Sequence, residues 1–541
     1  MSETQQETRQ VTPDFQQNPG YLADNVPPEE APYSVLSASE RRLLTAIIGF
    51  SMLFSPLSAN IYFPALGALQ TELDTTAQNI NLTITAYLIF QAVAPALLGD
   101  LADTFGRRPV FLLMYAIYTA ANIGLALQSD FVALLLLRML QSLGCSATVA
   151  VSYGVVADVA TASERGGMLG FAMIATNLGP ALAPLIGGGL IDGLGGWRSV
   201  FWFLTICGVI VLLVTLLFLP ETARHIVGNG KVLPHRRWRR PLVSLLFSGW
   251  KLPKAAVEAQ VGYEANETKS KEAWFPNPLR SVRILLDPEA AMVASMSAVF
   301  YTIYYCIQSS MSVIFSELYG FRALIVGVCY LSIGCGVVAG GISNGKFMDW
   351  NFGRVARSAG FSQDHKKIVD LSGFPIERAR LRLMFAYTLA CSCILAGYGW
   401  SVKYEAVSNT QYITLSEISF ELTLNMMKHV SIVLILQFGL GFITTCSVQT
   451  FNTLLVDIFQ ERPSAAAASG NIIRCGAAAG GIAAMNPLSD KVGYGWFFTI
   501  LAFVSALSGL GGTQLILRKG VGWRAKRKQL RDIPRLDVDR K

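Results

Sequence analysis

Charged side chains are scarce in this sequence and are gathered into a few segments. Only 15% of the 541 residues are Asp, Glu, Lys or Arg, whereas 52% are apolar. A soluble chain of this length would carry more charge on the surfaces of its domains. The apolar runs reach the length, about 20 residues, that crosses a bilayer as a helix with its own backbone hydrogen bonds. The composition therefore predicts a polytopic membrane protein embedded in a lipid bilayer.

The usual signals of catalysis and secretion are also missing. The nine cysteines lie in apolar segments, without the spacing of metal ligands and away from the polar loops that disulfides cross-link. Residues 1–40 are polar and lack the apolar core of a cleavable signal peptide. The sequence has no nucleotide-binding loop and no nucleophile paired with a base. We expect no enzyme activity, no metal and no cofactor.

Basic residues give the chain a net charge of +8, but their distribution argues against a nucleic-acid partner. Lys and Arg cluster in the tails and in alternate loops, as they do on the cytosolic side of membrane proteins. We therefore predict an even number of membrane helices with both termini in the cytosol, in the plasma membrane. Seven of the 44 basic residues lie outside the segments predicted to be cytosolic: Arg138, Arg198, Arg322, Lys403, Lys428, Arg474 and Lys491.

Twelve apolar runs are present, and they divide into two halves. A disordered tail (1–42) precedes an N-terminal bundle of six helices (43–222), and a basic loop (223–287) follows that bundle. A C-terminal bundle of six helices (288–517) and a basic tail (518–541) complete the chain. The predicted fold is all-α, with two pseudo-symmetric six-helix bundles, each built from inverted three-helix repeats. We expect the protein to act as a monomer.

A short charged turn separates the second and third apolar runs. It reads Gly99-Asp100-Leu101-Ala102-Asp103-Thr104-Phe105-Gly106-Arg107-Arg108-Pro109. Its glycines permit a sharp bend, and Pro109 suits the first turn of the next helix. This spacing resembles the signature loop between the second and third helices of the major facilitator superfamily. The resemblance implies a gating latch, and the alternative is an ordinary solvated turn. The predicted latch residues are Gly99, Asp103, Gly106, Arg107, Arg108 and Asp158.

The latch has predicted contacts and a predicted second copy. We expect Asp103 to accept hydrogen bonds from the start of the helix near Ser464, and Arg107 to pair with Asp158. Both contacts would form only while the cytosolic gate is closed. In the second half, Asp457 echoes Asp158. A second latch is predicted in a charged loop after Met348, with Gly345, Asp349 and Arg354 as its residues.

Two further motifs strengthen the resemblance. Arg138-Met139-Leu140-Gln141 looks like the motif of the fourth helix of the superfamily, although Ser142 stands where Gly is usual. A segment of the fifth helix resembles the antiporter motif of exporters, with Ala183 as its departure. The residues of that motif are Gly179, Pro180, Pro184, Gly187 and Gly188.

The resemblance can be narrowed to one branch. Together with the antiporter motif, the segment Leu219-Pro220-Glu221-Thr222 resembles the fungal twelve-helix drug:proton antiporter family. Residues 54–66 resemble the branch of quinidine-resistance-type pumps and citrate exporters. The resemblance implies export of a small organic molecule by alternating access, with protons as the coupling ion.

Arg138 and Arg474 lie inside predicted membrane helices, where a charge is costly and normally faces a cavity or a partner. Asn471 lies one helical turn from Arg474. A guanidinium there would hold an anion through two hydrogen bonds, or would pair structurally with nearby carbonyls. Polar residues that could line the same cavity are Asn60, Tyr62, Gln141, Asn177, Tyr301, Tyr305, Gln308, Gln437, Gln449 and Asn452.

Carboxylates at mid-membrane depth are missing from the same helices. Asp158, Asp192, Glu317 and Asp457 all fall near helix ends. Two deep cations without buried acids favour a neutral or anionic cargo, and export of an anion gains about 2.3 kcal/mol per charge per 100 mV of membrane potential. The family resemblance implies proton antiport instead, so the coupling stays open.

The sequence thus predicts a secondary transporter that exports drugs, metabolites or organic acids. A dedicated exporter of an organic anion such as citrate is the alternative within transport. A transporter-like nutrient sensor is the alternative from another class.

Overall fold

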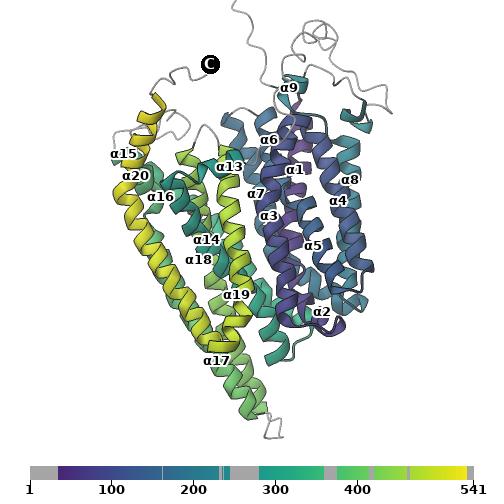
Figure 1. Cartoon of the computed structure of the whole chain (residues 1–541), viewed down its shortest axis with the longest axis vertical. Helices are drawn as coiled ribbons and strands as arrows, with labels where there is room; N and C mark the ends of the chain where they lie inside the picture. The colour runs from purple at the N-terminus through teal and green to yellow at the C-terminus, as the bar shows by residue number, and fades with distance from the viewer. Residues whose placement is uncertain are drawn as a thin grey trace, which may run out of the picture.

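The computed structural model describes residues 34–160, 162–230, 234, 237–243, 279–358, 374–412, 420–459 and 463–532. Throughout this part of the chain the regular elements are helices, and they form two groups that stand side by side (Figure 1). Ten of its segments are long and apolar enough to cross a membrane. Helix α7 (Ala162–Leu194) adds one crossing, and the last of the ten segments turns back on itself. The described helices therefore supply the twelve predicted crossings.

The N-terminal bundle starts at a well-formed helix cap. The Ser37 and Glu40 side chains form a capping box with each other's backbone amides, and α1 begins after it. The Thr76 and Asp130 side chains accept hydrogen bonds from backbone amides at the starts of α3 and α5. The helices are α1 (Ala38–Asn60), η1 (Phe63–Ala65), α2 (Leu66–Glu72), α3 (Ala77–Phe105), α4 (Arg107–Leu127), α5 (Phe131–Ser146), α6 (Thr148–Val159), α7 and α8 (Arg198–Phe218).

The C-terminal bundle follows three short elements, α9 (Arg224–Val227), η2 (Arg237–Arg239) and α13 (Leu279–Ile284). Its longest segment breaks at Gly493, whose φ of 79° is open to glycine without strain. The chain reverses there, and the second arm ends in α20, the long yellow helix of Figure 1. The helices are α14 (Pro288–Val313), η3 (Ile314–Leu318), α15 (Ala323–Ser358), α16 (Ile376–Leu381), α17 (Met384–Tyr412), α18 (Phe420–Ile458), α19 (Pro463–Ala506), η4 (Leu507–Gly511) and α20 (Gly512–Asp532).

The two ends of the molecule are distinguished below by their charged residues. The latch end holds residues 99–109, and it is the end where α9 lies in Figure 1. The far end holds Glu72 and Arg198, which form an ion pair. The predicted topology makes the latch end cytosolic.

The bundles meet closely along α7 and α15. At two of the close contacts a glycine on one helix faces the backbone of an alanine on the other. A Cβ atom on Gly188 would lie 2.3 Å from the Ala323 carbonyl oxygen. A Cβ atom on Gly334 would lie 2.3 Å from the Ala181 Cα atom. Small residues thus bring the two backbones into direct contact. Gly188 belongs to the predicted antiporter motif, so this part of the motif lies where the two bundles touch.

Hydrogen bonds between the bundles run from the far end to mid-depth. Near the far end, the Gln78 amide donates to the Ala483 carbonyl over 3.0 Å. Deeper in the membrane, the Ser309 hydroxyl donates to Asn81 Oδ1 over 2.9 Å. The deepest of the bonds recorded among the described residues joins Asn471 Nδ2 to the Gln91 carbonyl over 2.9 Å. These hydrogen bonds therefore join the two bundles from the far end to mid-depth.

Two predicted helix ends are wrong. The predicted loop after Met348 is helical, because α15 continues to Ser358 and Asn351 of this extension donates to the Ala379 carbonyl. Helix α20 continues past Leu517 to Asp532, because Arg524 and Arg527 of the extension form ion pairs with the bundle. Tertiary contacts, which the hydropathy pattern does not report, set both ends.

We predict that Gly334→Ala destabilises the protein. The added methyl group would press on the Ala181 backbone, and overpacking of this kind costs about 1–3 kcal/mol. Thermal unfolding of the purified protein would measure the loss. Gly353→Ala on the same helix is the control, because a Cβ atom there meets nothing within 4 Å. Equal melting temperatures for the two variants would contradict the close α7–α15 contact.

Candidate functional site

The predicted latch forms a compact network at the latch end. Arg107 Nε lies 3.1 Å from Asp158 Oδ2, as predicted, and the Arg107 guanidinium also pairs with Asp103. Glu221 Oε1 accepts hydrogen bonds from the Arg107 amide over 2.9 Å and from the Thr222 amide over 3.0 Å. The network therefore ties the start of α4 to the ends of α6 and α8.

Gly106 is required by this network. Its φ is 106°, a conformation that residues with side chains rarely adopt. A Cβ atom at this position would also lie 2.3 Å from Glu221 Oε2. The glycine of the motif thus makes room for the glutamate of the Leu219-Pro220-Glu221-Thr222 segment.

Arg108 has a different part from the one predicted. Its side chain is buried and donates to the Thr215 carbonyl over 2.8 Å, to the Leu216 carbonyl over 2.7 Å and to the Leu219 carbonyl. The Thr215 carbonyl also accepts from the Leu219 amide, whereas the Leu216 and Leu219 carbonyls are groups at the end of α8 that a cation satisfies and stabilises. Arg108 therefore caps α8 within the N-terminal bundle.

The predicted contact of Asp103 with the start of α19 stays a prediction. The Asp103 side chain is 61% exposed, and it pairs with Arg107 one turn further along the chain. The side chain of Ser464, the expected partner, lies outside the described part of the structure. The expectation that the Arg107–Asp158 pair forms only while the latch is closed likewise stays a prediction, although the pair itself is present.

The residues predicted for the second latch are placed apart from the ion pair that the structure shows at the latch end of the C-terminal bundle. Asp349 and Arg354 are exposed on α15, and a Cβ atom on Gly345 would meet nothing within 4 Å. Asp457 pairs instead with Arg380 of α16, at 2.8 Å between Arg380 Nε and Asp457 Oδ2. The Arg380–Asp457 pair is the counterpart of Arg107–Asp158. The basic run from Arg378 to Arg382, just before α17, is the sequence feature that could have predicted this pair.

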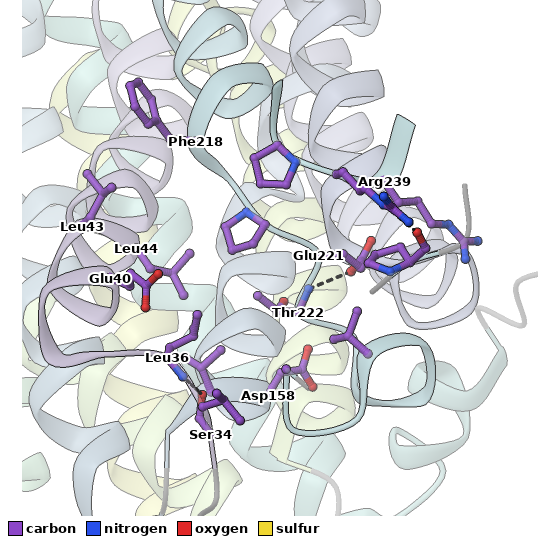
Figure 2. A pocket seen from close by; sticks show the side chains of 18 of the residues that line it. Ser34, Leu36, Glu40, Leu43, Leu44, Asp158, Phe218, Glu221, Thr222 and Arg239 are labelled. Carbon is purple, nitrogen blue, oxygen red and sulfur yellow. Dashed lines mark hydrogen bonds between the residues drawn. The ribbon is translucent and has the colours of Figure 1, made fainter. Parts of the chain in front are cut away.

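A pocket lies behind the first latch (Figure 2). Leu43 and Phe218 lie on one side of it, and Glu221 and Arg239 lie on the other. Its lining also includes Asp158. The lining residues belong to the N-terminal bundle and to the segments that precede and follow it, so this pocket is not between the bundles.

Arg138 is enclosed by aromatic rings in the N-terminal bundle. It is 1% exposed, and its guanidinium lies 4.1 Å from the centre of the Tyr62 ring and 4.4 Å from that of Tyr87. Its NH1 group donates to Gln141 over 2.5 Å, and Gln141 donates in turn to Asn122 over 2.7 Å. Cation–π contacts and amides replace the carboxylate that a buried guanidinium usually has. Its Nε group has no hydrogen-bond partner among the described atoms.

Arg474 lies between the bundles. It donates to Asn471 Oδ1 over 2.8 Å, as the helical spacing predicted, and its guanidinium lies 4.8 Å from the centre of the Tyr301 ring. The Asn471 amide reaches across to the Gln91 carbonyl of the other bundle. Tyr87, whose ring contacts Arg138, lies one helical turn from Gln91 on α3. The structure therefore brings the two predicted arginines to one region.

The other predicted cavity residues differ in burial and in their hydrogen bonds. Gln308 is buried, donates to the Tyr304 hydroxyl over 2.6 Å, and leaves its Oε1 atom without a partner within the described chain. Asn60 donates to the Pro56 carbonyl of its own helix over 2.6 Å, so it serves α1 itself. Gln449 and Asn452 are half-buried on α18, and a Cβ atom on Gly341 would lie 3.2 Å from the Gln449 amide nitrogen. Tyr87, Asn122 and Gln91 were missed, because single polar residues in apolar helices carry no periodic signal.

The charges at mid-depth suit an anion. Neither Arg138 nor Arg474 has an ion pair with any described carboxylate, and Arg474 keeps a buried Nε group without a hydrogen-bond partner. No group of three possible metal ligands occurs in the part of the chain searched. A carboxylate is the ligand whose geometry matches a free guanidinium edge.

We predict that Arg108→Leu lowers the stability of the protein, whereas Asp103→Asn lowers transport and leaves stability nearly unchanged. Loss of the Arg108 cap removes the side-chain donor from the Leu216 and Leu219 carbonyls and costs about 2 kcal/mol or more. Loss of the exposed Asp103 charge changes stability by less than about 1 kcal/mol, because exposed ion pairs contribute little. Thermal unfolding would separate the variants, and Asp103→Asn would cut transport while the protein stays folded. Normal transport by purified Asp103→Asn would contradict a latch role.

Comparison with known proteins agrees with the helices and motifs above. The sequence profile of the Major Facilitator Superfamily matches residues 48–408. MFS-type transporter phiD of a fungal species is 36% identical over 501 residues, which cover 92% of this chain and 71% of phiD. MFS-type transporter clz19 of Cochliobolus lunatus is 36% identical over 496 residues, which cover 92% of this chain and 88% of clz19. Citrate exporter 1 of Aspergillus niger is 30% identical over 512 residues, which cover 93% of this chain and 90% of the exporter. This chain belongs to the Major Facilitator Superfamily, and it is a secondary transporter of a small molecule rather than an enzyme.

Proposed function

We propose that this transporter exports an organic anion from the cytosol by alternating access. The observation that carries the proposal is Arg474, a guanidinium between the bundles that has no described carboxylate partner. A charge at this depth is costly unless a partner or ligand compensates it. A carboxylate cargo would supply that compensation while it is bound.

The surroundings of Arg474 also fit an organic acid. Tyr301 lies beside the guanidinium, and its hydroxyl donates to that of Tyr305 over 3.4 Å. The Arg138 guanidinium adds a second positive charge beside Tyr87, one helical turn from Gln91. Aromatic rings would bind the apolar part of a cargo, and the two charges would attract its carboxylates.

Several observations support the direction of transport and the membrane. The helix α7 segment from Gly179 to Gly188 resembles the antiporter motif of exporters. The basic segments lie at the latch end, which the positive-inside rule makes cytosolic. The hydrogen bonds between the bundles from the far end to mid-depth would close that end and leave the binding region open toward the cytosol, where an exported molecule enters. Both termini would lie in the cytosol, and the membrane would be the plasma membrane.

The relatives support the substrate class. One protein that is 30% identical over nearly all of both chains is named citrate exporter 1. Citrate carries three carboxyl groups, which suits a region with two guanidiniums. Export of such an anion gains about 2.3 kcal/mol per charge per 100 mV of membrane potential.

A second candidate is proton-coupled export of drugs, favoured by the resemblance to the drug:proton antiporter family. It needs an acid that exchanges a proton for the cargo near the binding region. The described residues around Arg138 and Arg474 include tyrosines and amides, and no carboxylate is recorded in contact with either arginine.

We predict that purified protein in liposomes transports citrate and that Arg474→Gln loses most of this transport. Removal of one charge-assisted contact to the cargo costs about 1.5–3 kcal/mol, which is roughly a tenfold to hundredfold loss. Radiolabelled citrate flux would be measured under an imposed membrane potential and, separately, under an imposed pH gradient. Arg357→Gln is the control, because Arg357 is exposed at the end of α15.

The outcomes distinguish the candidates. Potential-driven citrate flux that depends on Arg474 supports anion export. Flux of cationic drugs that follows only the pH gradient, without citrate flux, would overturn it in favour of the second candidate. No net flux of any of these compounds would favour a transporter-like sensor.

A further inference from the structure

Helix α20 is fastened to the latch end of the C-terminal bundle by buried charges. Arg527 pairs with Asp287 at 2.7 Å and with Glu289 at 2.8 Å. Arg524 pairs with Glu377 at 2.8 Å. Glu289 is 0% exposed and Glu377 is 2% exposed. The extension of α20 that hydropathy did not predict is therefore held by three acidic side chains.

Each buried glutamate uses only one of its oxygens. Oε2 of Glu289 and Oε2 of Glu377 accept from the arginines, whereas both Oε1 atoms lack a hydrogen-bond partner within the described chain. A buried ionised oxygen without a partner is costly. One buried donor of the same cluster, Arg524 Nε, also lacks a partner, so at least one of the two oxygens still calls for a donor.

The two free oxygens face the same point. A Cβ atom on Gly520 of α20 would lie 3.0 Å from Glu377 Oε1 and 3.2 Å from Glu289 Oε1. The oxygens are therefore separated by no more than the sum of these distances. Residue 520 has no side chain to fill the space between them.

Among the side chains that the structure describes, the charges around this point do not balance. Three carboxylates, those of Asp287, Glu289 and Glu377, face the two guanidiniums of Arg524 and Arg527. Other charges nearby are engaged or exposed. On α16, Arg380 pairs with Asp457 of α18, and Arg378 is exposed; Arg283 of α13 is exposed as well.

Helix α15 contributes an amide, Asn351, whose Oδ1 atom accepts from Arg382. It therefore adds no charge toward the two glutamates. The recorded ion pairs of the described residues thus set three carboxylates against two guanidiniums.

We propose that the buried Glu289 binds a proton in the folded protein, and that this proton holds α20 against α14 and α16. The proton adds to a Glu289 oxygen, which becomes the missing donor and removes one negative charge. Two carboxylates that share a buried site commonly share one proton in this way. The site lies at the latch end, away from Arg138 and Arg474, so it is independent of the proposed substrate and direction.

The proposal fixes the pH dependence of stability. In the unfolded chain Glu289 is ionised near neutral pH, whereas in the folded protein it holds a proton. Unfolding then releases a proton, so a rise in pH favours unfolding. The unfolding equilibrium constant rises by about tenfold per pH unit while Glu289 of the native protein keeps its proton.

The test is thermal unfolding of the full-length protein in detergent from mildly acidic to mildly alkaline pH. We expect the melting temperature of the natural protein to fall over this interval. Glu289→Gln and Glu377→Gln should each flatten the profile, because the amide supplies a donor and no proton is released. Each should be more stable than the natural protein at alkaline pH. Glu72→Gln, at the ion pair of the far end, is the matched control and should keep the natural slope.

Gly520→Ala tests the geometry. Its methyl group would press on both free oxygens and should lower the melting temperature, whereas Gly522→Ala should not, because a Cβ atom there meets nothing within 4 Å. Equal melting temperatures for these two variants would count against the shared site.

Infrared difference spectra of the natural protein provide a readout that needs no variant. A protonated carboxyl band at neutral pH that disappears at alkaline pH supports the proposal. Absence of that band would overturn it, and so would unchanged slopes in both glutamine variants. A melting temperature that rises with sodium at fixed pH would also overturn it, because a metal cation would then occupy the site.

Discussion

A charge buried in a bilayer needs a partner, and this constraint organises the protein. At the latch end the partners are carboxylates and helix ends. Arg107 pairs with Asp158, Arg380 pairs with Asp457, and Arg108 caps the carbonyl end of α8. At mid-depth, Arg138 and Arg474 are surrounded by aromatic rings and amides instead. The paired charges therefore stabilise the fold, whereas the two arginines without described carboxylates are suited to a ligand.

The two bundles are held together differently at their two ends. Glycines on α7 and α15 bring the backbones into contact, and hydrogen bonds join α3 to α14 and α19 from the far end to mid-depth. Asp103 is exposed at the opposite end. An alternating-access cycle would exchange these arrangements, and closure of the latch end would bring Asp103 to a new partner. The pairs Arg107–Asp158 and Arg380–Asp457 each lie within one bundle, so they would keep each bundle rigid during the exchange.

Much of the fold could be predicted from the sequence because hydropathy reports membrane helices directly. Apolar runs predict the twelve crossings. The loop motif predicts the Arg107–Asp158 pair, and the helical spacing of three residues predicts the Arg474–Asn471 contact. The ends of α15 and α20 could not be predicted, because Asn351, Arg524 and Arg527 stabilise them through contacts distant in sequence. The second latch was assigned to Arg354 by an echo of the first motif, whereas the fold brings Arg380 to Asp457. The glutamates Glu289 and Glu377 were missed for the same reason, since their burial depends on α20.

We propose that the mid-depth guanidiniums bind an anionic cargo and that the protein transports this cargo across the membrane. The most direct measurement is the current produced when citrate is added rapidly to liposomes that contain the protein on a conducting support. We expect a current whose sign shows that negative charge moves in the same direction as citrate. The Arg474→Gln protein should give no such current. A current that appears only with cationic compounds, or a citrate current that survives loss of Arg474, would contradict it.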